Sequence, residues 1–426
     1  MFLGKAVRVF FLFAAAAAGT FELMSGNTVN GKEKKMQDLV LNRSNIVAGL
    51  PGLLDGVASP ADWMNRRRLE IRRFFEDNFF GKVPPQPEKL SFVIEKEVPC
   101  FDGLGIRREV LILMEGRYGK HQAKALWYLP ASASAENPVP LVCGLNFKGN
   151  AACTSETDVP LDDAEGHGVQ TGRWQIPYLL EQGISLITAP RNHFFPDEPE
   201  GSLNSIFKLS VPAEKLAKID RSYTAISAWA WGCSRLLDLG LSDPAIDRDA
   251  VWVHGHSRLG KTALWAGAND SRFSGVVSND SGCCGAAIAR DPHPKSEMFA
   301  SIAKVFTWWF VPAFDRFAGH DSEQDFDMHF LSALTAPRPL LIASASEDVW
   351  ADPFNEFRAT LAVTPLYRFL GAAGMPDDAQ FPAPDNAVIG DKVAYELREG
   401  IHDVQLYDWQ VVVEYIRKNR IPAVRK

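Results

Sequence analysis

The fold is decided by the stretch Val251-Trp-Val-His-Gly255-His-Ser257-Arg258-Leu-Gly260-Lys261 of the 426-residue chain. A run of β-branched and aromatic residues ends in Gly255-x-Ser257, and a helix-forming run follows from Lys261. Glycines at 255 and 260 let the main chain turn sharply and approach the next element closely. A nucleophile elbow has this layout, in which a tight strand-to-helix turn presents a serine hydroxyl above the end of a sheet. The stretch therefore predicts a serine hydrolase with Ser257 as nucleophile.

The elbow also carries positive charge. The second glycine comes one residue later than in the usual G-x-S-x-G, and Arg258 and Lys261 lie beside the serine. The N-terminus of the following helix adds main-chain N–H groups and the positive end of a helix dipole beside a developing oxyanion. We therefore expect a substrate that interacts with two positively charged side chains.

Composition narrows the class of protein. The chain has 46% hydrophobic and 23% charged residues, as in a soluble globular protein, and a net charge of -7. This balance argues against nucleic acid or an anionic membrane as the main partner. The six cysteines form no C-x-x-C pair, so a structural zinc site is not expected, whereas one or two disulfides are compatible with an oxidising compartment.

The N-terminus has the pattern of a secretory signal peptide. Lys5 and Arg8 precede an apolar, alanine-rich run over residues 9–19, which is too short for a membrane-spanning helix. We expect a signal peptide over about residues 1–25, an N-terminal extension over 26–57 and a single catalytic domain over 58–426. The protein is then exported, either to the periplasm or out of the cell.

Strands and helices alternate along the second half of the chain, which favours parallel pairing with helices on both faces of the sheet. The pattern predicts an α/β-hydrolase fold with a mostly parallel central sheet in a three-layer αβα sandwich. Expected helices lie at 59–80, 221–239, 353–370 and 404–418, with one more after Ser257. Expected strands lie at 109–115, 123–130, 139–146, 184–189, 250–253, 273–278, 339–345 and 393–398.

The partners of Ser257 follow from chain order, which in α/β hydrolases is serine, acid, histidine. Of the nine histidines, only His402 follows the penultimate strand, in a loop that parallel strands bring to the edge of the elbow. We expect His402 to be the general base. Two acids compete to orient it: Asp348, after the strand at 339–345, and Asp280, one strand earlier.

Further segments match one family. With the elbow, Asp280, Asp348 and His402 in place, the chain resembles the glucuronoyl esterases of carbohydrate esterase family 15, whose elbow reads G-x-S-R-x-G-K. The resemblance runs from about Trp63 to Trp409 and includes segments 144–150, 228–232, 281–287, 330–339 and 347–353. It implies an acyl-enzyme mechanism that cleaves the ester between 4-O-methyl-glucuronic acid of xylan and an alcohol of lignin.

The resemblance also implies roles for the residues around the nucleophile. Arg258 becomes an oxyanion donor through its main-chain N–H and its guanidinium. Lys261, with Glu297 and Trp350, becomes the binding site for the uronic sugar. An ammonium and a carboxylate that grip vicinal hydroxyls beside an aromatic face form a chemically sound sugar site.

No metal or organic cofactor is needed for this chemistry. The expected partner is glucuronoxylan or a lignin–carbohydrate ester, and we expect a monomer. Two alternatives stay open: an acetyl-xylan or other carbohydrate esterase with the same triad, and an inactive protein that binds glucuronoxylan.

The chain departs from the family pattern at three places. Asp280 stands where many members have glutamate, which favours Asp348 as the acid because the aspartate side chain is one methylene shorter. Trp308 stands where a histidine is frequent, and segment 190–201 is unusual. We therefore expect substrate preference beyond the uronic group to differ.

Overall fold

The computed structural model describes residues 46–162 and 164–420. The predicted signal peptide lies outside these residues, as does the extension up to residue 45. Residues 46–57 pack on the rest of the described chain: Ile46 and Leu53 are buried, and the main-chain oxygen of Ile46 accepts a hydrogen bond from Arg358 Nε at 2.8 Å. Within the described part, none of the helices has the length and apolar character needed to cross a membrane.

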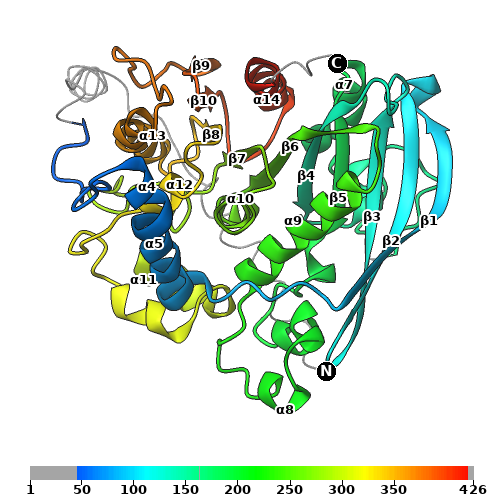
Figure 1. The fold of residues 1–426 in the computed structure, drawn as a ribbon, viewed down its shortest axis with the longest axis horizontal. Coiled ribbons are helices and arrows are strands. Elements are labelled where there is room, and N and C mark those ends of the chain that lie inside the picture. Colours follow the sequence, from blue (N-terminus) through cyan, green and yellow to red (C-terminus); the bar gives the residue numbers. More distant parts are fainter. Residues whose placement is uncertain (1–45, 163, 421–426) are drawn as a thin grey trace, which may run out of the picture. The chain divides into compact units, whose positions relative to one another are not determined.

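A ten-stranded sheet forms the centre of the described chain, in the order β1-β2-β3-β5-β4-β6-β7-β8-β10-β9. Strands β5, β4, β6, β7, β8 and β10 pair in parallel, whereas β1, β2, β3 and β9 pair antiparallel at the two ends. The predicted mostly parallel α/β sheet is confirmed (Figure 1). The strands are β1 Lys89–Cys100, β2 Gly105–Gly116, β3 Gly119–Pro130, β4 Val139–Asn146, β5 Ser185–Pro190, β6 Ile246–His256, β7 Gly275–Asn279, β8 Leu340–Ala345, β9 Asn386–Ile389 and β10 Val393–Arg398.

Helices cover both faces of this sheet, which gives the expected three layers (Figure 1). Helices α7 and α14 lie on one face, and α9, α10 and α13 lie on the other. The α-helices are α4 Pro60–Asp62, α5 Arg68–Phe75, α6 Thr171–Trp174, α7 Ile176–Glu181, α8 Ala213–Leu216, α9 Ala225–Leu241, α10 Arg258–Asn269, α11 Phe299–Val305, α12 His329–Ala333, α13 Pro353–Phe369 and α14 Leu406–Asn419. Two π-helical turns, Trp63–Arg67 and Glu76–Phe80, flank α5, and short 3₁₀ turns lie at Phe101–Gly103, Asn150–Cys153, Arg191–His193, Gly201–Asn204, Ile206–Leu209, Thr307–Trp309 and Pro312–Phe317.

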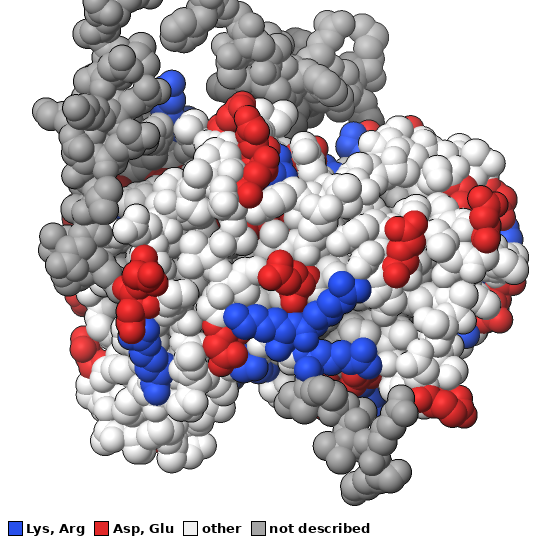
Figure 2. Space-filling model, turned by 90° about the horizontal axis from the view of Figure 1, so that it is seen from above, with Lys and Arg blue, Asp and Glu red and all other residues white. Residues whose placement is uncertain are grey.

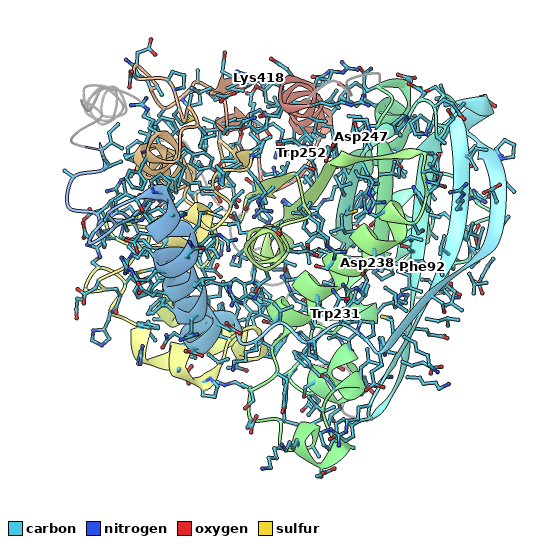
Figure 3. The ribbon with its side chains drawn as sticks, viewed as in Figure 1. Phe92, Trp231, Asp238, Asp247, Trp252 and Lys418 are labelled. Atoms are coloured by element: carbon cyan, nitrogen blue, oxygen red, sulfur yellow. The ribbon has the colours of Figure 1, made fainter. Side chains whose placement is uncertain are left out.

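The two faces of the sheet pack differently. Trp252 of β6 points toward α14, where its ring meets that of Tyr415 edge to face with centroids 5.7 Å apart (Figure 3). On the other face two helices approach the strands through glycine. A Cβ on Gly240 of α9 would lie 2.2 Å from Leu141 Cδ2, and one on Gly267 of α10 would lie 2.3 Å from Val276 Cγ2. Glycine therefore sets how close α9 and α10 lie to the sheet.

The predicted helix over 59–80 is present as α4, α5 and their π-helical turns. The Ser59 hydroxyl accepts a hydrogen bond from the main-chain N–H of Asp62 at 3.1 Å, the cap that the sequence predicts. Phe79 contacts Phe75 and Phe314 with ring centroids 5.0 Å apart. Phe80 packs on Trp265 of α10 at 5.3 Å, so this segment supports the helix that follows the elbow.

Strands β1 and β9 were absent from the sequence prediction. Both are edge strands, and β1 leaves Val93 and Ile94 about half exposed. An edge strand with two partly exposed faces has no clear alternation of apolar and polar residues, so its pattern resembles a loop. The eight strands and the four long helices that were predicted agree with the structure to within a few residues at their ends.

The six cysteines are all free and buried, so none of the disulfides considered from composition is present. The adjacent Cys283 and Cys284 have Sγ atoms 3.8 Å apart and are not bonded. Burial raises the pKa of the Cys143 and Cys153 thiols well above the usual range, which makes them unreactive.

Charged side chains of opposite sign lie next to one another on the face that Figure 2 shows. Its group of Lys and Arg side chains is bordered by Asp and Glu. The positive side chains at the centre of this face are therefore flanked by negative ones.

The chain turns sharply at Ser257, between β6 and α10. Ser257 has φ 58° and ψ -128°, a backbone conformation that residues other than glycine rarely adopt. A Cβ on Gly255 would lie 1.8 Å from the main-chain oxygen of Leu259, and one on Gly260 would lie 2.9 Å from that of Asn279. The glycines predicted from the motif are required because strand, helix and the end of β7 meet here.

Gly255→Ala tests this constraint. We expect the variant to lose at least about 3 kcal/mol of unfolding free energy, because the added methyl must separate β6 from α10. Urea denaturation followed by circular dichroism measures the loss. The matched control is Gly172→Ala, where an added Cβ meets nothing within 4 Å and stability should change by less than about 1 kcal/mol. Equal stability of the two variants would contradict the described elbow.

Candidate active site

Four of the predicted residues lie just beyond the carboxyl ends of four parallel strands. Ser257 follows β6, Asp280 follows β7, Asp348 comes soon after β8, and His402 comes soon after β10. Parallel strands place their carboxyl ends at one edge of the sheet, so topology alone brings these side chains to the same place.

His402 and Asp348 form the shortest contact of the group. His402 Nδ1 lies 2.5 Å from Asp348 Oδ2, which leaves Nε2 free to face another group. The Asp348 side chain is 5% exposed, and the imidazole is 41% exposed. The two loops are also joined through main chain, because Glu347 N donates to the oxygen of Gly400 at 2.8 Å. The geometry is that of an acid that orients a histidine.

Asp280 lies deeper and farther from the histidine. Its Oδ2 is 3.9 Å from His402 Nδ1, and its Oδ1 accepts a hydrogen bond from the main-chain N–H of Ala345 at 2.7 Å. Complete burial, together with the negative charges of Asp348 and other buried acids, raises the pKa of Asp280 well above its usual range. A carboxyl that favours its neutral form is a weaker partner for an imidazolium than Asp348.

His256 was not identified from the sequence. Its ring lies beside that of His402 with centroids 4.4 Å apart. It is buried, and its Nδ1 lies 2.5 Å from Asn279 Oδ1. Burial lowers the pKa of His256 well below the usual range, so a neutral ring supports the imidazole of His402. The residue between Gly255 and Ser257 is variable in the general motif, so the motif gave no signal for it.

One group of metal-ligating atoms occurs among the described residues. His256, Asp280 and His402 have ligand atoms within 4.8 Å of one another. The Nδ1 atoms of both histidines already contact hydrogen-bond acceptors, on Asn279 and Asp348. Hydrogen bonding therefore accounts for the arrangement without an ion.

The guanidinium of Arg258 has a carboxylate partner that sequence reasoning missed. Arg258 Nη1 donates to Asp197 Oδ2 at 2.5 Å, and the guanidinium lies over the Trp309 ring at 4.6 Å. Asp197 also accepts from the indole N–H groups of Trp308 and Trp309, each at 2.8 Å. Burial alone would raise the pKa of Asp197, but Arg258 and Arg191 hold it below the usual value.

This cluster joins two features that stood out in the sequence. Asp197 belongs to the unusual segment 190–201, and Trp308 is the residue found where the family often has histidine. Both departures from the family pattern therefore meet at Asp197, the carboxylate partner of Arg258. The sequence showed that segment 190–201 is unusual, but it gave no signal that Asp197 pairs with Arg258.

The three residues predicted for sugar binding lie together. Lys261 Nζ donates to the main-chain oxygen of Ser281 at 2.6 Å and lies 3.9 Å from Glu297 Oε2. The main-chain N–H of Glu297 donates to the oxygen of Trp350 at 2.9 Å, and Trp350 is 54% exposed. Burial raises the pKa of Glu297, although the nearby Lys261 acts to lower it. Lys261 follows Ser257 by one helical turn, so the cluster lies beside the nucleophile.

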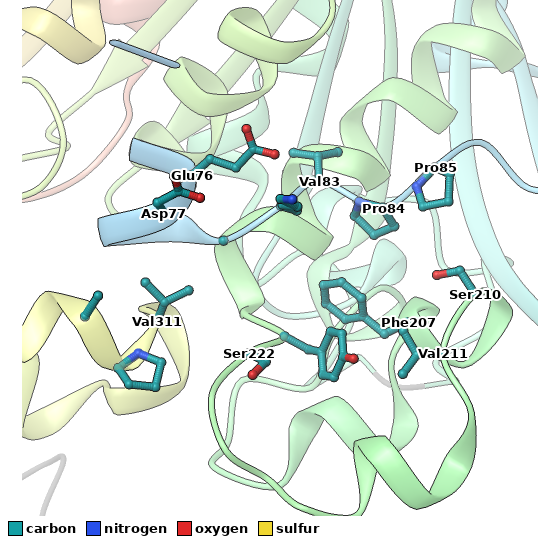
Figure 4. Close-up of a pocket in the computed structure, with 15 residues that line it drawn as sticks. Glu76, Asp77, Val83, Pro84, Pro85, Phe207, Ser210, Val211, Ser222 and Val311 are labelled. Atoms are coloured by element: carbon teal, nitrogen blue, oxygen red, sulfur yellow. The ribbon is translucent and has the colours of Figure 1, made fainter. Parts of the chain in front are cut away.

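A hollow of about 490 Å³ lies elsewhere in the structure (Figure 4). Its lining includes Glu76, Pro84, Phe207, Tyr223 and Val311. None of the candidate catalytic or sugar-binding residues borders it, so volume alone does not identify the active site.

The fold is that of an α/β hydrolase, with Ser257 at a strand-to-helix elbow and His402 after the last parallel strand, the positions expected for the nucleophile and base of a serine hydrolase. The family described as glucuronyl esterase of fungi matches residues 172–371. A carbohydrate esterase, MZ0003, from an unknown prokaryotic organism is 36% identical over 382 residues, which are 85% of this chain and 87% of that protein.

Two solved structures agree with this class. A glucuronoyl esterase from Solibacter usitatus is 33% identical with a TM-score of 0.79, over 87% of this chain and 97% of that one. A promiscuous CE15 esterase from a marine bacterial metagenome is 35% identical with a TM-score of 0.76, over the same shares. The chain belongs to carbohydrate esterase family 15 (CE15), a family of carboxylic ester hydrolases.

The two acids can be separated by amide substitution. Asp348→Asn should lower kcat at least about 100-fold, because the amide removes the charge that stabilises the imidazolium. Asp280→Asn should lower kcat less than about 10-fold, because the amide resembles the neutral carboxyl that burial favours. Steady-state kinetics on one ester substrate measure both effects. A larger loss in Asp280→Asn would reassign the orienting acid.

Proposed function

We propose that this chain is a serine esterase that hydrolyses the ester between (4-O-methyl-)glucuronic acid of xylan and an alcohol of lignin. The observation that carries the proposal is the cluster of Lys261, Glu297 and Trp350, one helical turn from Ser257. A simple esterase has no need for a buried ammonium and a carboxylate beside its nucleophile. Membership of CE15 and the similarity to a glucuronoyl esterase agree with this choice.

The reaction proceeds in two steps. His402, oriented through Nδ1 by Asp348, takes the proton of Ser257 through Nε2, and the serine oxygen attacks the uronic ester carbonyl. The alcohol leaves with the proton from His402, and an acyl-enzyme remains. Water, activated by the same histidine, then releases the uronic acid and restores Ser257.

Charge on the tetrahedral intermediate is stabilised at the start of α10. The main-chain N–H of Arg258 lies in the first turn of this helix, where N–H groups lack intrahelical partners. Arg258 Nε is buried and has no hydrogen-bond partner among the described residues. A buried, unpartnered donor supports a role in donating a hydrogen bond to the oxyanion.

The sugar is held beside the ester by three groups. The Lys261 ammonium donates to ring hydroxyls, and the Glu297 carboxylate accepts from them. The exposed indole of Trp350 offers an apolar face to the sugar ring. Together they fix the uronic group while the alcohol extends outward.

A wider range of esters is the second candidate. The CE15 relative from the marine metagenome is described as promiscuous, and it is as similar in sequence to this chain as the named glucuronoyl esterase. An acetyl-xylan or other carbohydrate esterase would use the same triad.

The enzyme acts after export under this proposal. Lys5, Arg8 and the apolar run over 9–19 have the form of a signal peptide, and lignified xylan lies outside the cell that degrades it. We propose a monomer in the periplasm or the medium.

Hydrolysis of benzyl glucuronate, compared with para-nitrophenyl acetate, tests the function. Lys261→Met should lower kcat/KM for the glucuronate ester about 10- to 100-fold through loss of charged hydrogen bonds, and should leave acetate hydrolysis nearly unchanged. Ser257→Ala should lose both activities by about 10⁴-fold or more. The matched control is Lys392→Met, because Lys392 bonds Asn419 at the opposite edge of the sheet.

Two results would contradict the proposal. Preference for acetate, with the same activity in the Lys261→Met variant, would leave the triad but make the protein an acetyl esterase. Retained activity in Ser257→Ala would remove Ser257 as the nucleophile.

A further inference from the structure

Arg398 is a buried arginine at the end of β10, just before the loop that carries His402. Its guanidinium donates to three main-chain oxygens of that loop: Nη1 to Glu399 at 2.6 Å, and Nη2 to Ile401 at 2.7 Å and to Asp403 at 3.0 Å. These oxygens lie on both sides of His402 in the chain. The rigid, planar guanidinium of this one arginine therefore fixes the main-chain conformation of the loop.

Apolar packing does little to fix this loop. Gly400 has φ 108°, in a region that favours glycine, and Ile401 is 64% exposed, so apolar packing contributes little here. Other polar contacts add support. Arg173 Nε donates to Asp403 Oδ1 at 2.5 Å, and the oxygen of Gly400 accepts from Glu347 N at 2.8 Å. Gly400 N donates to Ser346 Oγ at 3.2 Å, and Glu399 N donates to Asp385 Oδ1 at 2.9 Å. Arg398 differs from these because it contacts the loop from beneath at three points.

Asp408 of α14 compensates the buried charge of Arg398. Its Oδ2 lies 2.9 Å from Arg398 Nε, and both side chains are 2% exposed. Asp408 also accepts from the main-chain N–H of Gln405 at 2.6 Å and from Asn279 Nδ2 at 3.2 Å. A buried arginine is tolerated when its charge is paired. Asp408 supplies that pairing for Arg398, although Nε has no hydrogen-bond partner among the described residues.

Asn279 extends this chain of contacts to the nucleophile. Its main-chain oxygen accepts from the N–H of Ser257 at 2.9 Å. Its side-chain oxygen lies 2.5 Å from Nδ1 of His256, whose ring packs beside His402. Asn279 is buried at the end of β7, between the elbow and the acid loop. The contacts therefore run without interruption from the nucleophile to the base.

We propose that Arg398, Asp408 and Asn279 form a positioning brace that sets His402 against Ser257. The proposal rests on the role of His402 as general base in the proposed function. The brace touches neither substrate nor the reacting atoms, so its members act through the His402 loop and the elbow. Loss of the brace displaces the imidazole and slows proton transfer while the sugar site stays intact.

The test is Arg398→Lys, which keeps the charge and removes the planar guanidinium. We expect kcat on an activated ester such as para-nitrophenyl acetate to fall about 10- to 100-fold with KM changed less than about 2-fold, since small misplacement of a catalytic group costs this much. Labelling of Ser257 by a fluorophosphonate, which needs the same base but no sugar, should slow by the same factor. Asp408→Asn should show a smaller loss in the same direction.

The matched control is Arg338→Lys. Arg338 also donates to three main-chain oxygens, those of Gly267, Asp270 and Phe273. It lies just before β8, at the amino-terminal end of the parallel strands and away from His402. This variant should lose stability, as Arg398→Lys does, but keep kcat and the labelling rate. Equal kcat in both variants would overturn the proposal. If Arg398→Lys does not fold, the comparison of Asp408→Asn with Arg338→Lys decides in the same way.

The outcome is separable from that of the proposed function. A wild type that is labelled at Ser257 and inactive on glucuronate esters overturns the proposed substrate and leaves the brace to be decided by labelling rates. A wild type that is not labelled at Ser257 overturns both.

Discussion

The close approach of β6 to α10 at Gly255 is the constraint on which the rest of the site depends. It forces Ser257 into a backbone conformation that costs about 1–3 kcal/mol, which only a well-packed surrounding structure can hold. Helix α10 supplies that packing. It contacts α9 and the sheet, and its Trp265 packs against Phe80. The same turn starts the helix whose first turn carries Arg258 and Lys261. The proposed nucleophile, oxyanion donor and sugar-binding lysine therefore share one rigid element.

Beneath the reacting groups lies a layer of buried acids that must be kept neutral or paired. Burial raises the pKa of Glu356 to about 7, although its carboxylate accepts hydrogen bonds from Ser344 and Gly282. Burial also raises the pKa of Asp408 to about 6, against the effect of Arg398. Burial shifts Asp280 and Glu356 toward their neutral forms and Asp408 is paired with Arg398, so Asp348 is the acid left in hydrogen-bond contact with His402. The electrostatics and the geometry favour the same pair.

Sequence alone predicted the residues that local motif and chain order define. The role proposed for Ser257 follows from the elbow and that of His402 from its place after the last parallel strand. The role proposed for Lys261 follows from the family resemblance, and helical spacing places it on the same face as Ser257. What it missed are contacts between distant segments: Asp197 lies 61 residues before Arg258, and nothing local marks it as a partner. Arg398 was placed in the last strand from the sequence. A strand pattern does not show, however, that its guanidinium bonds the main chain of the loop that follows. The edge strand β1 was missed because exposure removed its alternation.

Fluorophosphonate labelling with substrate-site protection tests the central claim most directly, that Ser257 is a nucleophile beside a uronic-acid site. The protein is treated with the probe alone, with free glucuronate or with xylose at the same concentration, and the modified peptide is identified by mass spectrometry. The account predicts one adduct, on Ser257, whose formation glucuronate slows and xylose does not. An adduct on another residue, or equal rates with both sugars, would contradict it.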